Sequence, residues 1–209
     1  MAKSVGDLDV FRARAEQTMA SGRIKPLAIE QWQPLNRVYV DLRIAADGEW
    51  LYRGQPIQRP ELIRLFASIL RREPDGYYLV TPHEKAKIQV DDAPLLVVDA
   101  TLSMEEPDSQ SLTVDGEPLP LIAMQVITNT ETEFSITPEH PIVSLSEWSR
   151  RTGQAPPSGS NRDNALYVLL DRGLSARVSR GVFYRLSDFV TLSRDGQPGL
   201  MIANQWYPL

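Results

Sequence analysis

The sequence contains no cysteine and no long run of apolar residues. Without thiols the chain can form neither disulfides nor zinc–thiolate sites, and it has no cysteine nucleophile. A membrane-spanning helix needs about 18 consecutive apolar residues, and residues 1–30 lack the apolar segment of an export signal. Together these absences predict a cytoplasmic protein that has no membrane partner.

Catalytic motifs are equally scarce. The chain has two histidines, His83 and His140, and neither belongs to an HExxH zinc pattern. The Gly-x-Ser-x-Gly element and the glycine patterns of P-loop and dinucleotide-binding proteins are absent. The net charge of −5 argues against a nucleic-acid polymer as partner, because phosphate binding draws on clustered lysine and arginine. The sequence therefore predicts no cofactor and no triad chemistry.

The length and the hydrophobic content of the sequence are typical of a folded globular protein. Its 209 residues, 42% of them hydrophobic, are enough for one large domain or two small ones. A chain of this length buries roughly 70% of the surface that it exposes when unfolded, so its core needs no disulfide or metal.

Residues 47–94 carry the densest series of structural signals. Just before this stretch, Val38–Ile44 alternates apolar and polar residues. A turn then leads back into Trp50–Arg53, which predicts a hairpin. Pro60 suits the first turn of a helix. Apolar residues at helical spacing predict that this helix continues to Arg72.

The rest of the chain has mostly the pattern of strands. Residues 150–164, rich in proline, glycine, serine and asparagine, are typical of a loop. Residues 183–190 have helical spacing, and residues 200–206 predict a last strand. We therefore predict an α+β fold with mostly antiparallel sheets, in three parts: an N-terminal helix at 1–22, a small α+β domain at 23–90, and a mainly β, barrel-like domain with a C-terminal helix at 91–209.

Two weak internal similarities suggest a duplicated strand-turn-helix core. Residues 39–59 and 167–185 each open with Tyr-Val, reach an Arg-Gly pair and lead into an apolar helix. A second similarity pairs YLVTPHE with FSITPEH. If the duplication is real, the corners Arg53–Gly54 and Arg180–Gly181 are equivalent, and the interface between the two halves is the natural ligand cleft.

A group of polar residues near these corners is the strongest candidate for a site. Guanidinium groups and the backbone N–H groups at a helix start both donate to anions. The alternative is a salt-bridge network that only fixes the two halves. The predicted ligand-binding residues are Arg53, Arg59, Thr81, Glu84, Asp91, Asp92, Arg177 and Arg180.

Two other interpretations stay open. In the first, a hydrolase or transferase takes its base from the His83–Glu84 pair and holds a metal ion at the Asp91–Asp92 pair. An acidic turn before a proline is more often a solvated turn. In the second, exposed aromatic residues near Trp206–Tyr207 dock a partner protein on a scaffold without chemistry.

The chain also resembles the bacterial family catalogued as domain of unknown function 1285. The resemblance is carried by residues 41–94, by Thr128–Asn129, by His140–Pro141 and by the segment ARVSRGVFYRL. It covers nearly the whole chain, and its most specific pieces are DGEWLYRGQPI and LVTPHEK.

This resemblance implies an α+β fold with a duplicated core, two small domains and a C-terminal part similar to a pleckstrin-homology-like barrel. It implies no established activity. It does imply a cleft between the domains as a site for a nucleotide-like ligand, with a role in signal transduction. The residues at the matching motifs are Arg53, Thr81, Glu84, Asp91, Asp92, Arg177 and Arg180.

We therefore expect a non-catalytic protein that binds a small anionic, nucleotide-like ligand between its halves and reports it to a signalling partner. The arginines would hold the anion. Glu84, Asp91 and Asp92 would meet ribose or base donors, or orient the arginines.

Overall fold

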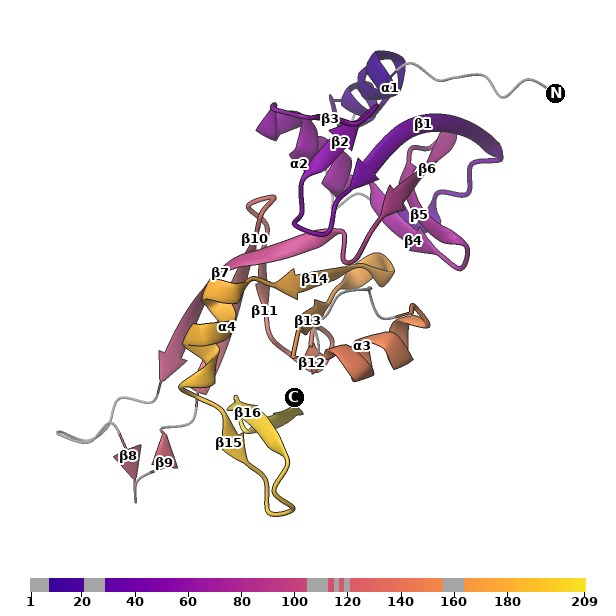
Figure 1. The fold of residues 1–209 in the computed structure, drawn as a ribbon. Coiled ribbons are helices and arrows are strands. Elements are labelled where there is room, and N and C mark those ends of the chain that lie inside the picture. Colours follow the sequence, from indigo (N-terminus) through magenta and orange to yellow (C-terminus); the bar gives the residue numbers. More distant parts are fainter. Residues whose placement is uncertain (1–7, 21–28, 105–112, 115–116, 119–120, 156–163) are drawn as a thin grey trace. The chain divides into compact units, whose positions relative to one another are not determined.

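The computed structural model describes residues 8–20, 29–104, 113–114, 117–118, 121–155 and 164–209 (Figure 1). It has a mixed α+β fold in which strands predominate, as the sequence predicts. The chain divides into two compact units. Unit 1 comprises Met1–Pro94 with Arg172–Leu174, and unit 2 comprises Leu95–Asp171 with Ser175–Leu209.

Unit 1 is built on one six-stranded sheet with the strand order β3-β2-β1-β6-β5-β4. All neighbouring strands are antiparallel except β1 and β6, which are parallel. The strands are β1 (Asn36–Ile44), β2 (Trp50–Tyr52), β3 (Gln55–Pro56), β4 (Leu70–Glu73), β5 (Gly76–Val80) and β6 (Glu84–Val90).

The predicted hairpin is confirmed as β1 and β2, in which Leu42 pairs with Tyr52 and Ile44 with Trp50. Along β1 the side chains alternate between buried and exposed from Val40 to Ile44, as the sequence pattern requires. Between β2 and β3 the chain turns on Arg53 and Gly54, whose φ angles are 50° and 75°. Two successive positive φ angles define the tight hairpin turn that favours glycine at its second position.

The helix predicted at residues 60–72 is shorter than expected. Helix α2 spans Pro60–Ser68, and the chain then enters β4. Leu70–Glu73 pairs in register with Gly76–Leu79 of β5, so the backbone hydrogen bonds of the sheet replace those of a further helical turn. The apolar spacing alone could not reveal this change, because Ile69 and Leu70 are buried in either structure.

Helices α1 (Leu8–Ala20) and α2 supply apolar residues to the core of unit 1. The ring of Phe66 lies 6.4 Å from that of Phe11 and 6.3 Å from that of Trp50, and all three residues are buried. A short 3-10 helix, η1 (Ile29–Gln31), brings Ile29 and Trp32 against Tyr78 and Val80.

Unit 2 contains one long sheet path, β12-β13-β14-β7-β10-β16-β15. β11 pairs with β10, β17 pairs with β16, and β8 and β9 form a separate pair. The strands are β7 (Leu95–Met104), β8 (Thr113–Val114), β9 (Glu117–Pro118), β10 (Leu121–Thr128), β11 (Glu133–Ser135), β12 (Ile142–Ser144), β13 (Leu166–Leu169), β14 (Ser175–Val178), β15 (Thr191–Leu192), β16 (Pro198–Ile202) and β17 (Gln205–Pro208), and the 3-10 turn η2 (Asp171–Gly173) joins β13 to β14.

Helix α3 (Leu145–Thr152) corrects the predicted loop at residues 150–164, of which residues 156–163 lie outside the described ranges. Trp148 fixes this helix, because its ring stacks on Tyr167 at 4.6 Å and its Nε1 donates to Ser175 Oγ at 2.9 Å. Gly153, with φ of 66°, ends the helix in the left-handed conformation.

Helix α4 (Arg180–Ser187) begins and ends three residues earlier than the predicted helix at 183–190. Ser179 caps its first turn by accepting a hydrogen bond from the N–H of Val182. The helix is not the C-terminal element of the chain, because three strands follow it.

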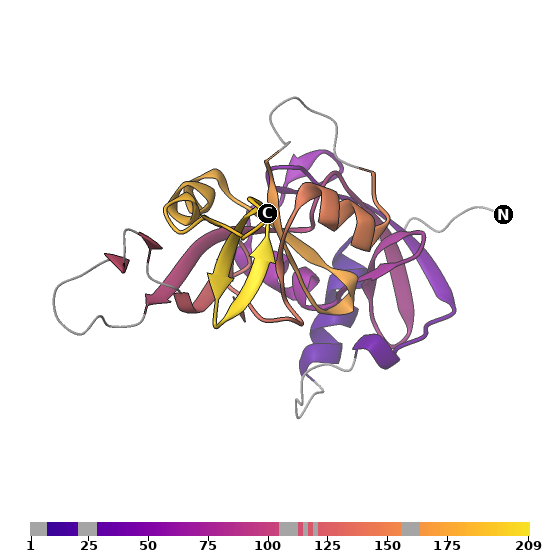
Figure 2. The same ribbon diagram turned by 90° about the horizontal axis from the view of Figure 1, so that it is seen from below.

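The strand predicted at residues 200–206 is in fact a hairpin. β16 and β17 run side by side (Figure 2), and they are joined at Ala203 and Asn204, both of which have positive φ. A turn with positive φ angles usually contains glycine. Because Ala203 and Asn204 take these positions, the sequence pattern did not predict the turn.

The proposed duplication is not confirmed, and its two Arg-Gly corners are not equivalent. Arg53–Gly54 forms a hairpin turn, whereas Arg180–Gly181 forms the first turn of α4. In unit 1 the first strand of the hairpin, β1, lies beside its parallel partner β6. In unit 2 it is the second strand, β14, that lies beside its parallel partner β7.

The second internal similarity reflects a shared turn. In both Thr-Pro segments the threonine N–H donates to the carbonyl three residues later, Thr81 to Glu84 at 2.9 Å and Thr137 to His140 at 3.3 Å. In return the threonine hydroxyl accepts from the N–H of that later residue, at 3.1 and 3.2 Å. The same turn chemistry is enough to explain the similar letters.

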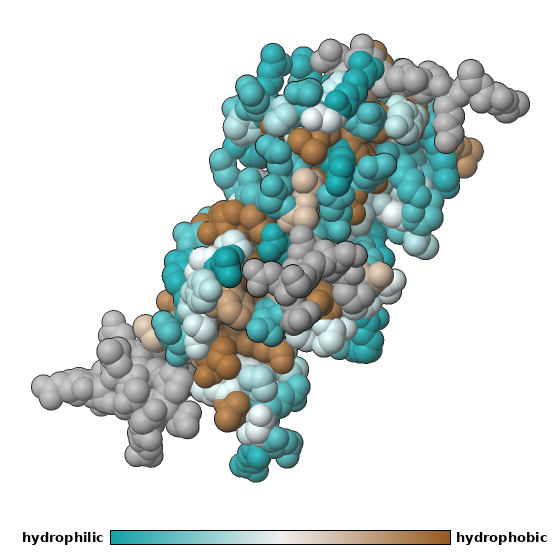
Figure 3. Space-filling model, viewed as in Figure 1, coloured by the Kyte–Doolittle hydropathy of each residue, from teal (hydrophilic) through white to brown (hydrophobic). Residues whose placement is uncertain are grey.

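The surface of unit 1 in the view of Figure 3 is mostly hydrophilic, whereas unit 2 shows several apolar patches. Tyr184 and Leu192, which are 59% and 69% exposed, are among the exposed apolar residues of unit 2. In the described part of the chain no helix combines the length and the hydropathy that a membrane span requires.

Candidate functional site: a groove at the register shift of β1 and β6

One face of the unit 1 sheet carries a row of polar and aromatic side chains. The strand register places Arg71 of β4 opposite Tyr78 of β5, Tyr78 opposite Lys87 of β6, and Lys87 opposite Tyr39 of β1. In the neighbouring row Lys85 of β6 is opposite Arg37 of β1. Because side chains on paired positions share a face, this side of the sheet is rich in cations and tyrosines.

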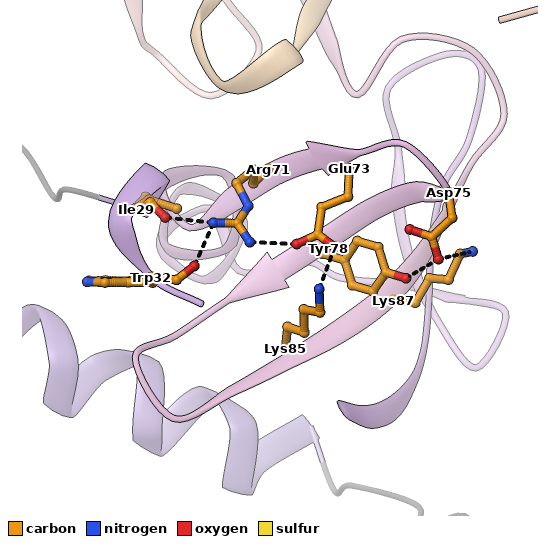
Figure 4. Close-up of polar contacts among 8 residues, drawn as sticks. All are labelled: Ile29, Trp32, Arg71, Glu73, Asp75, Tyr78, Lys85 and Lys87. Atoms are coloured by element: carbon orange, nitrogen blue, oxygen red, sulfur yellow. Dashed lines mark hydrogen bonds and ion pairs between the residues drawn. The ribbon is translucent and has the colours of Figure 1, made fainter. Parts of the chain in front are cut away.

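At the β4 end the row is closed by hydrogen bonds (Figure 4). Arg71, 8% exposed, donates from Nη1 to the carbonyls of Ile29 and Trp32, both at 2.8 Å, and from Nη2 to Glu73 at 2.5 Å. Lys85 donates to the other oxygen of Glu73. These bonds hold η1 on the sheet and tie Arg71, Glu73 and Lys85 into one cluster.

Burial alone would raise the pKa of Glu73. The hydrogen bonds and positive charges of Lys85 and Arg71 together outweigh that effect and hold the pKa of Glu73 below its ordinary value. The carboxylate is therefore ionised at neutral pH and neutralises one of its two buried cations.

Toward β1 the network is more open. Tyr78 donates its hydroxyl proton to Asp75 at 2.6 Å, and Lys87 Nζ lies 3.4 Å from the same carboxylate oxygen. Burial and the bond to Asp75 raise the pKa of Tyr78 to about 12. The phenol is thus protonated at neutral pH and acts as a hydrogen-bond donor, not as a base.

A groove of about 500 Å³ lies at this open end. The ladder between β1 and β6 shifts register there. From Tyr39 to Arg43 strand β1 advances four residues, whereas β6 advances only two, from Lys87 to Gln89. A bulge of this kind bends a strand and redirects its side chains, and bulges are frequent beside functional sites. The groove is lined by Arg37, Val38, Tyr39, Val40, Asp41, Leu42, Asp75, Tyr78, Lys87, Ile88 and Gln89.

Two cations are available at the groove. The guanidinium carbon of Arg37 lies 6.0 Å from the centre of the Tyr78 ring, and none of the described carboxylates forms an ion pair with Arg37. Lys87 is half-exposed, and its contact with Asp75 is long. Tyr39, 46% exposed, presents a ring beside them. An anion with a planar ring system would find both kinds of contact here.

The sequence-predicted residues of unit 1 lie at several places outside this groove. Thr81 and Glu84 meet in the turn before β6, and both are 1% exposed. Asp91 and Asp92 follow the other end of β6, where Asp91 is paired with Arg43 Nη2 at 2.7 Å and Asp92 is buried. At about 3.3 Å per residue, the seven steps from Glu84 to Asp91 separate the two groups by roughly 23 Å. A small ligand cannot contact both.

The two predicted arginines of unit 1 are also apart from each other. Arg53 lies on the β2–β3 turn, where its guanidinium carbon is 5.0 Å from the ring of Tyr52. Arg59 precedes α2 and lines a second, more open hollow, in which Arg12 pairs with Glu16 and Arg64 with Glu61.

The remaining two predicted residues belong to unit 2. Arg177 is half-buried on β14, opposite Tyr167 on one side and Leu96 on the other. Arg180 is exposed at the first position of α4. A ligand cleft shared between the two halves of the chain is not tested by these positions and stays a prediction.

The geometry of unit 1 also bears on the hydrolase interpretation. His83 and Glu84 lie at one end of β6, and Asp91 and Asp92 lie at the other, so one metal-assisted site cannot contain both pairs. Within the described ranges, no three histidine, aspartate or glutamate side chains are grouped so that they could hold a metal ion.

The aromatic pair proposed for a scaffold is not a free surface. Tyr207 is buried at 5% exposure. Trp206 lies over Gly199, where a methyl group on the glycine would come within 2.3 Å of the indole ring. Trp206 therefore packs on Gly199 of β16, and the Tyr207 side chain is buried.

Comparison with known proteins places the chain in a family. The family model described as "Domain of unknown function (DUF1285), N-terminal domain" matches residues 27–93. A crystal structure of a DUF1285 family protein from Silicibacter pomeroyi DSS-3 matches with a TM-score of 0.72 and 33% sequence identity, over 94% of this chain and 93% of that chain. This chain belongs to the DUF1285 family. The resemblance noted in the sequence is thereby confirmed.

A second DUF1285 family structure, from Shewanella baltica OS155, matches with 28% identity and a TM-score of 0.46, over 72% of this chain and 93% of that one. No curated protein matches the sequence. All residues that line the groove lie within the stretch matched by the DUF1285 N-terminal model. The groove therefore belongs to the part of the chain that the family model describes.

Proposed function

We propose that this DUF1285 protein binds a small anionic, nucleotide-like ligand in the groove at the β1–β6 register shift, without carrying out chemistry on it. The observation that carries the proposal is the state of Arg37. Its side chain lines a groove of about 500 Å³, and its guanidinium forms no ion pair with any described carboxylate. A volume of this size suits a small organic ligand.

The surrounding residues suggest how such a ligand would be held. Arg37 and Lys87 would take the phosphate or carboxylate group, since a guanidinium fork and an ammonium both donate to oxyanions. Tyr39 would stack on a planar ring. Asp41 and Gln89 would meet hydrogen-bond donors on the sugar or base.

The proposal moves the expected site from the predicted residues to neighbouring ones. It keeps the ligand class expected from the sequence and keeps a role in signal transduction, with the bound ligand reported to a protein partner. We also keep the pleckstrin-homology-like barrel as a proposal for unit 2. Its support is a long mixed sheet path with α4 packed on β7, where Arg185 pairs with Asp99 at 2.5 Å.

A thermal-shift screen with inorganic phosphate, nucleoside mono- and diphosphates and sugar phosphates tests the ligand proposal. A ligand present at about 100 times its dissociation constant stabilises the folded state by about 2.7 kcal/mol, which raises the midpoint by several degrees in a chain of this size. We expect Arg37→Ala and Lys87→Ala to abolish the shift produced by the best compound.

Arg59→Ala is the matched control, because it removes an exposed arginine of unit 1 that lies outside the groove. A shift that survives both groove substitutions but disappears with Arg59→Ala would contradict the groove assignment. A screen in which no anion moves the midpoint would contradict the ligand class.

A further inference from the structure

The groove at the β1–β6 register shift is lined by carboxylates as well as by cations. Arg37 and Lys87 carry positive charge there, and Asp41 and Asp75 carry negative charge. A carboxylate repels an anionic ligand, unless the same ligand also brings it a hydrogen-bond donor. The carboxylates therefore restrict which anions fit, an inference that rests on the ligand-binding function proposed above.

One of the two carboxylates, Asp75, is engaged within the protein. It accepts the hydroxyl proton of Tyr78 at 2.6 Å, and Lys87 Nζ lies 3.4 Å from the same oxygen. The bond from Tyr78 is the main cause that holds the pKa of Asp75 below its ordinary value. Asp75 therefore serves to position these two side chains on the groove wall.

The other carboxylate, Asp41, is open to a ligand. Its side chain is exposed, and among the described residues none donates a hydrogen bond to it or forms an ion pair with it. Arg43, two positions further along the same face of β1, is already engaged, because its Nε and Nη2 donate to Asp91 at 2.9 and 2.7 Å. A donor on the ligand would therefore meet a carboxylate that has no competing partner in the described part of the chain.

The groove residues of β1 follow a fixed order along one face. Arg37, Tyr39 and Asp41 occupy alternate positions of the strand, and all three are exposed. Four steps of a strand span at most about 13 Å, and the register shift shortens this distance, because β1 advances four residues beside two of β6. A cation, an aromatic ring and a carboxylate thus follow one another over about the length of a nucleoside monophosphate.

The chemistry of the bases decides which nucleotide suits this order. A carboxylate offers two acceptor oxygens side by side, so it is best matched by two parallel donors. Guanine has such a pair in its ring N1–H and its 2-amino group. Adenine and cytosine place an acceptor nitrogen beside their amino group, and that nitrogen would face the second carboxylate oxygen.

We propose that the groove selects a guanine nucleotide, with Asp41 accepting hydrogen bonds from the N1–H and the 2-amino group of the base. Arg37 holds the phosphate at the other end of the row. Tyr39, between them, stacks on the purine. Asp41 is therefore the residue that determines base specificity, whereas the cations bind any nucleotide.

Titration calorimetry with three monophosphates of the same charge tests this selection in the wild-type protein. The ligands are guanosine, inosine and adenosine monophosphate. Inosine keeps the ring N1–H but lacks the 2-amino group, so it loses one of the two bonds. A hydrogen bond to a charged group changes affinity by about tenfold or more, so we expect inosine monophosphate to bind about tenfold more weakly than guanosine monophosphate. Adenosine monophosphate should bind most weakly of the three.

The variant Asp41→Asn should move two ligands in different directions. It keeps the shape of the side chain and the backbone bond from the Arg53 N–H to the carbonyl of residue 41. Guanosine monophosphate should lose about tenfold in affinity, because one acceptor oxygen is replaced by an amide donor. Adenosine monophosphate should bind equally well or more tightly, because the carboxylate no longer repels it. A role of Asp41 in folding alone would weaken both ligands alike.

Asp195→Asn is the matched control, since it removes the same charge at an exposed position of unit 2. We expect it to leave all three affinities unchanged, and the thermal midpoint of each variant without ligand shows that it is folded. Equal binding of the three monophosphates that is lost in Arg37→Ala would overturn the guanine selection and leave the groove as a general nucleotide site. Equal weakening of all three in Asp41→Asn would also refute it. Binding of none of them would remove the selection and the nucleotide-like ligand class together.

Discussion

Replacing Glu73 with glutamine tests the role assigned to the buried ionic cluster of unit 1. The substitution keeps the shape of the side chain but removes the only carboxylate that the described structure gives to both Arg71 and Lys85, each 8% exposed. Breaking a buried ion pair by removing one partner costs about 3–5 kcal/mol. Arg71 keeps the carbonyls of Ile29 and Trp32, so we expect the low end, about 3 kcal/mol.

Thermal unfolding and hydrogen exchange measure this loss at two levels. A cost of about 3 kcal/mol lowers the midpoint by roughly 6–12 °C in a chain of this size. Amides of β4–β6 should exchange faster, since the cluster links β4, β6 and η1. Glu61→Gln is the control, because Glu61 is exposed and its contact with Arg64 spans 3.6 Å. We expect it to cost less than about 0.5 kcal/mol.

The same cluster predicts the direction of a pH effect. Glu73 has a folded-state pKa below its ordinary value of 4.5, so between the two values the unfolded chain binds more protons than the folded one. Its contribution to stability is complete above about pH 4.5 and is lost as the pH falls toward the folded pKa. Glu73→Gln should therefore flatten that part of the stability profile. A glutamine variant no less stable than Glu61→Gln, with an unchanged acid profile, would refute this account of the cluster.

Two further predictions concern single side chains. In Gly199→Ala the new methyl group would meet the Trp206 ring at 2.3 Å, so we expect a cost of about 1–3 kcal/mol in thermal unfolding; an unaffected midpoint would show that the indole does not pack on this glycine. Ultraviolet titration should show one tyrosine that ionises near pH 12 and is absent in Tyr78→Phe, because burial and Asp75 raise the pKa of Tyr78 to about 12. If the Tyr78→Phe curve instead lost an ordinary tyrosine near pH 10, the bond to Asp75 would be in doubt.

The elements that the sequence predicted correctly are those fixed by local signals. The β1–β2 hairpin follows from strict alternation and a nearby turn, and α2 begins at Pro60 as expected. The end of α2 could not be predicted in the same way. Ile69 and Leu70 continue the helical spacing, and only the pairing of β4 with β5 decides that they leave the helix.

The groove was missed because it depends on a contact between distant residues. Its register shift arises where β1 runs parallel to β6, whose paired residues are 48 positions away in the sequence before the shift and 46 after it. One local signal was available. Lys85, Lys87 and Gln89 alternate along β6 and so share a face, as Arg37 and Tyr39 do on β1. The predicted residues Thr81 and Asp91 instead lie at strand ends, where turn chemistry and an ion pair account for them.

The most direct test of the central claim is hydrogen exchange of the wild-type protein with and without the compound that gives the largest thermal shift. We predict that protection is concentrated in residues 36–42, 75–78 and 87–89, and that it is lost in Lys87→Ala. Protection centred on Arg53, Arg59 or the Asp91–Asp92 turn, with the groove segments unchanged, would contradict the groove as the ligand site.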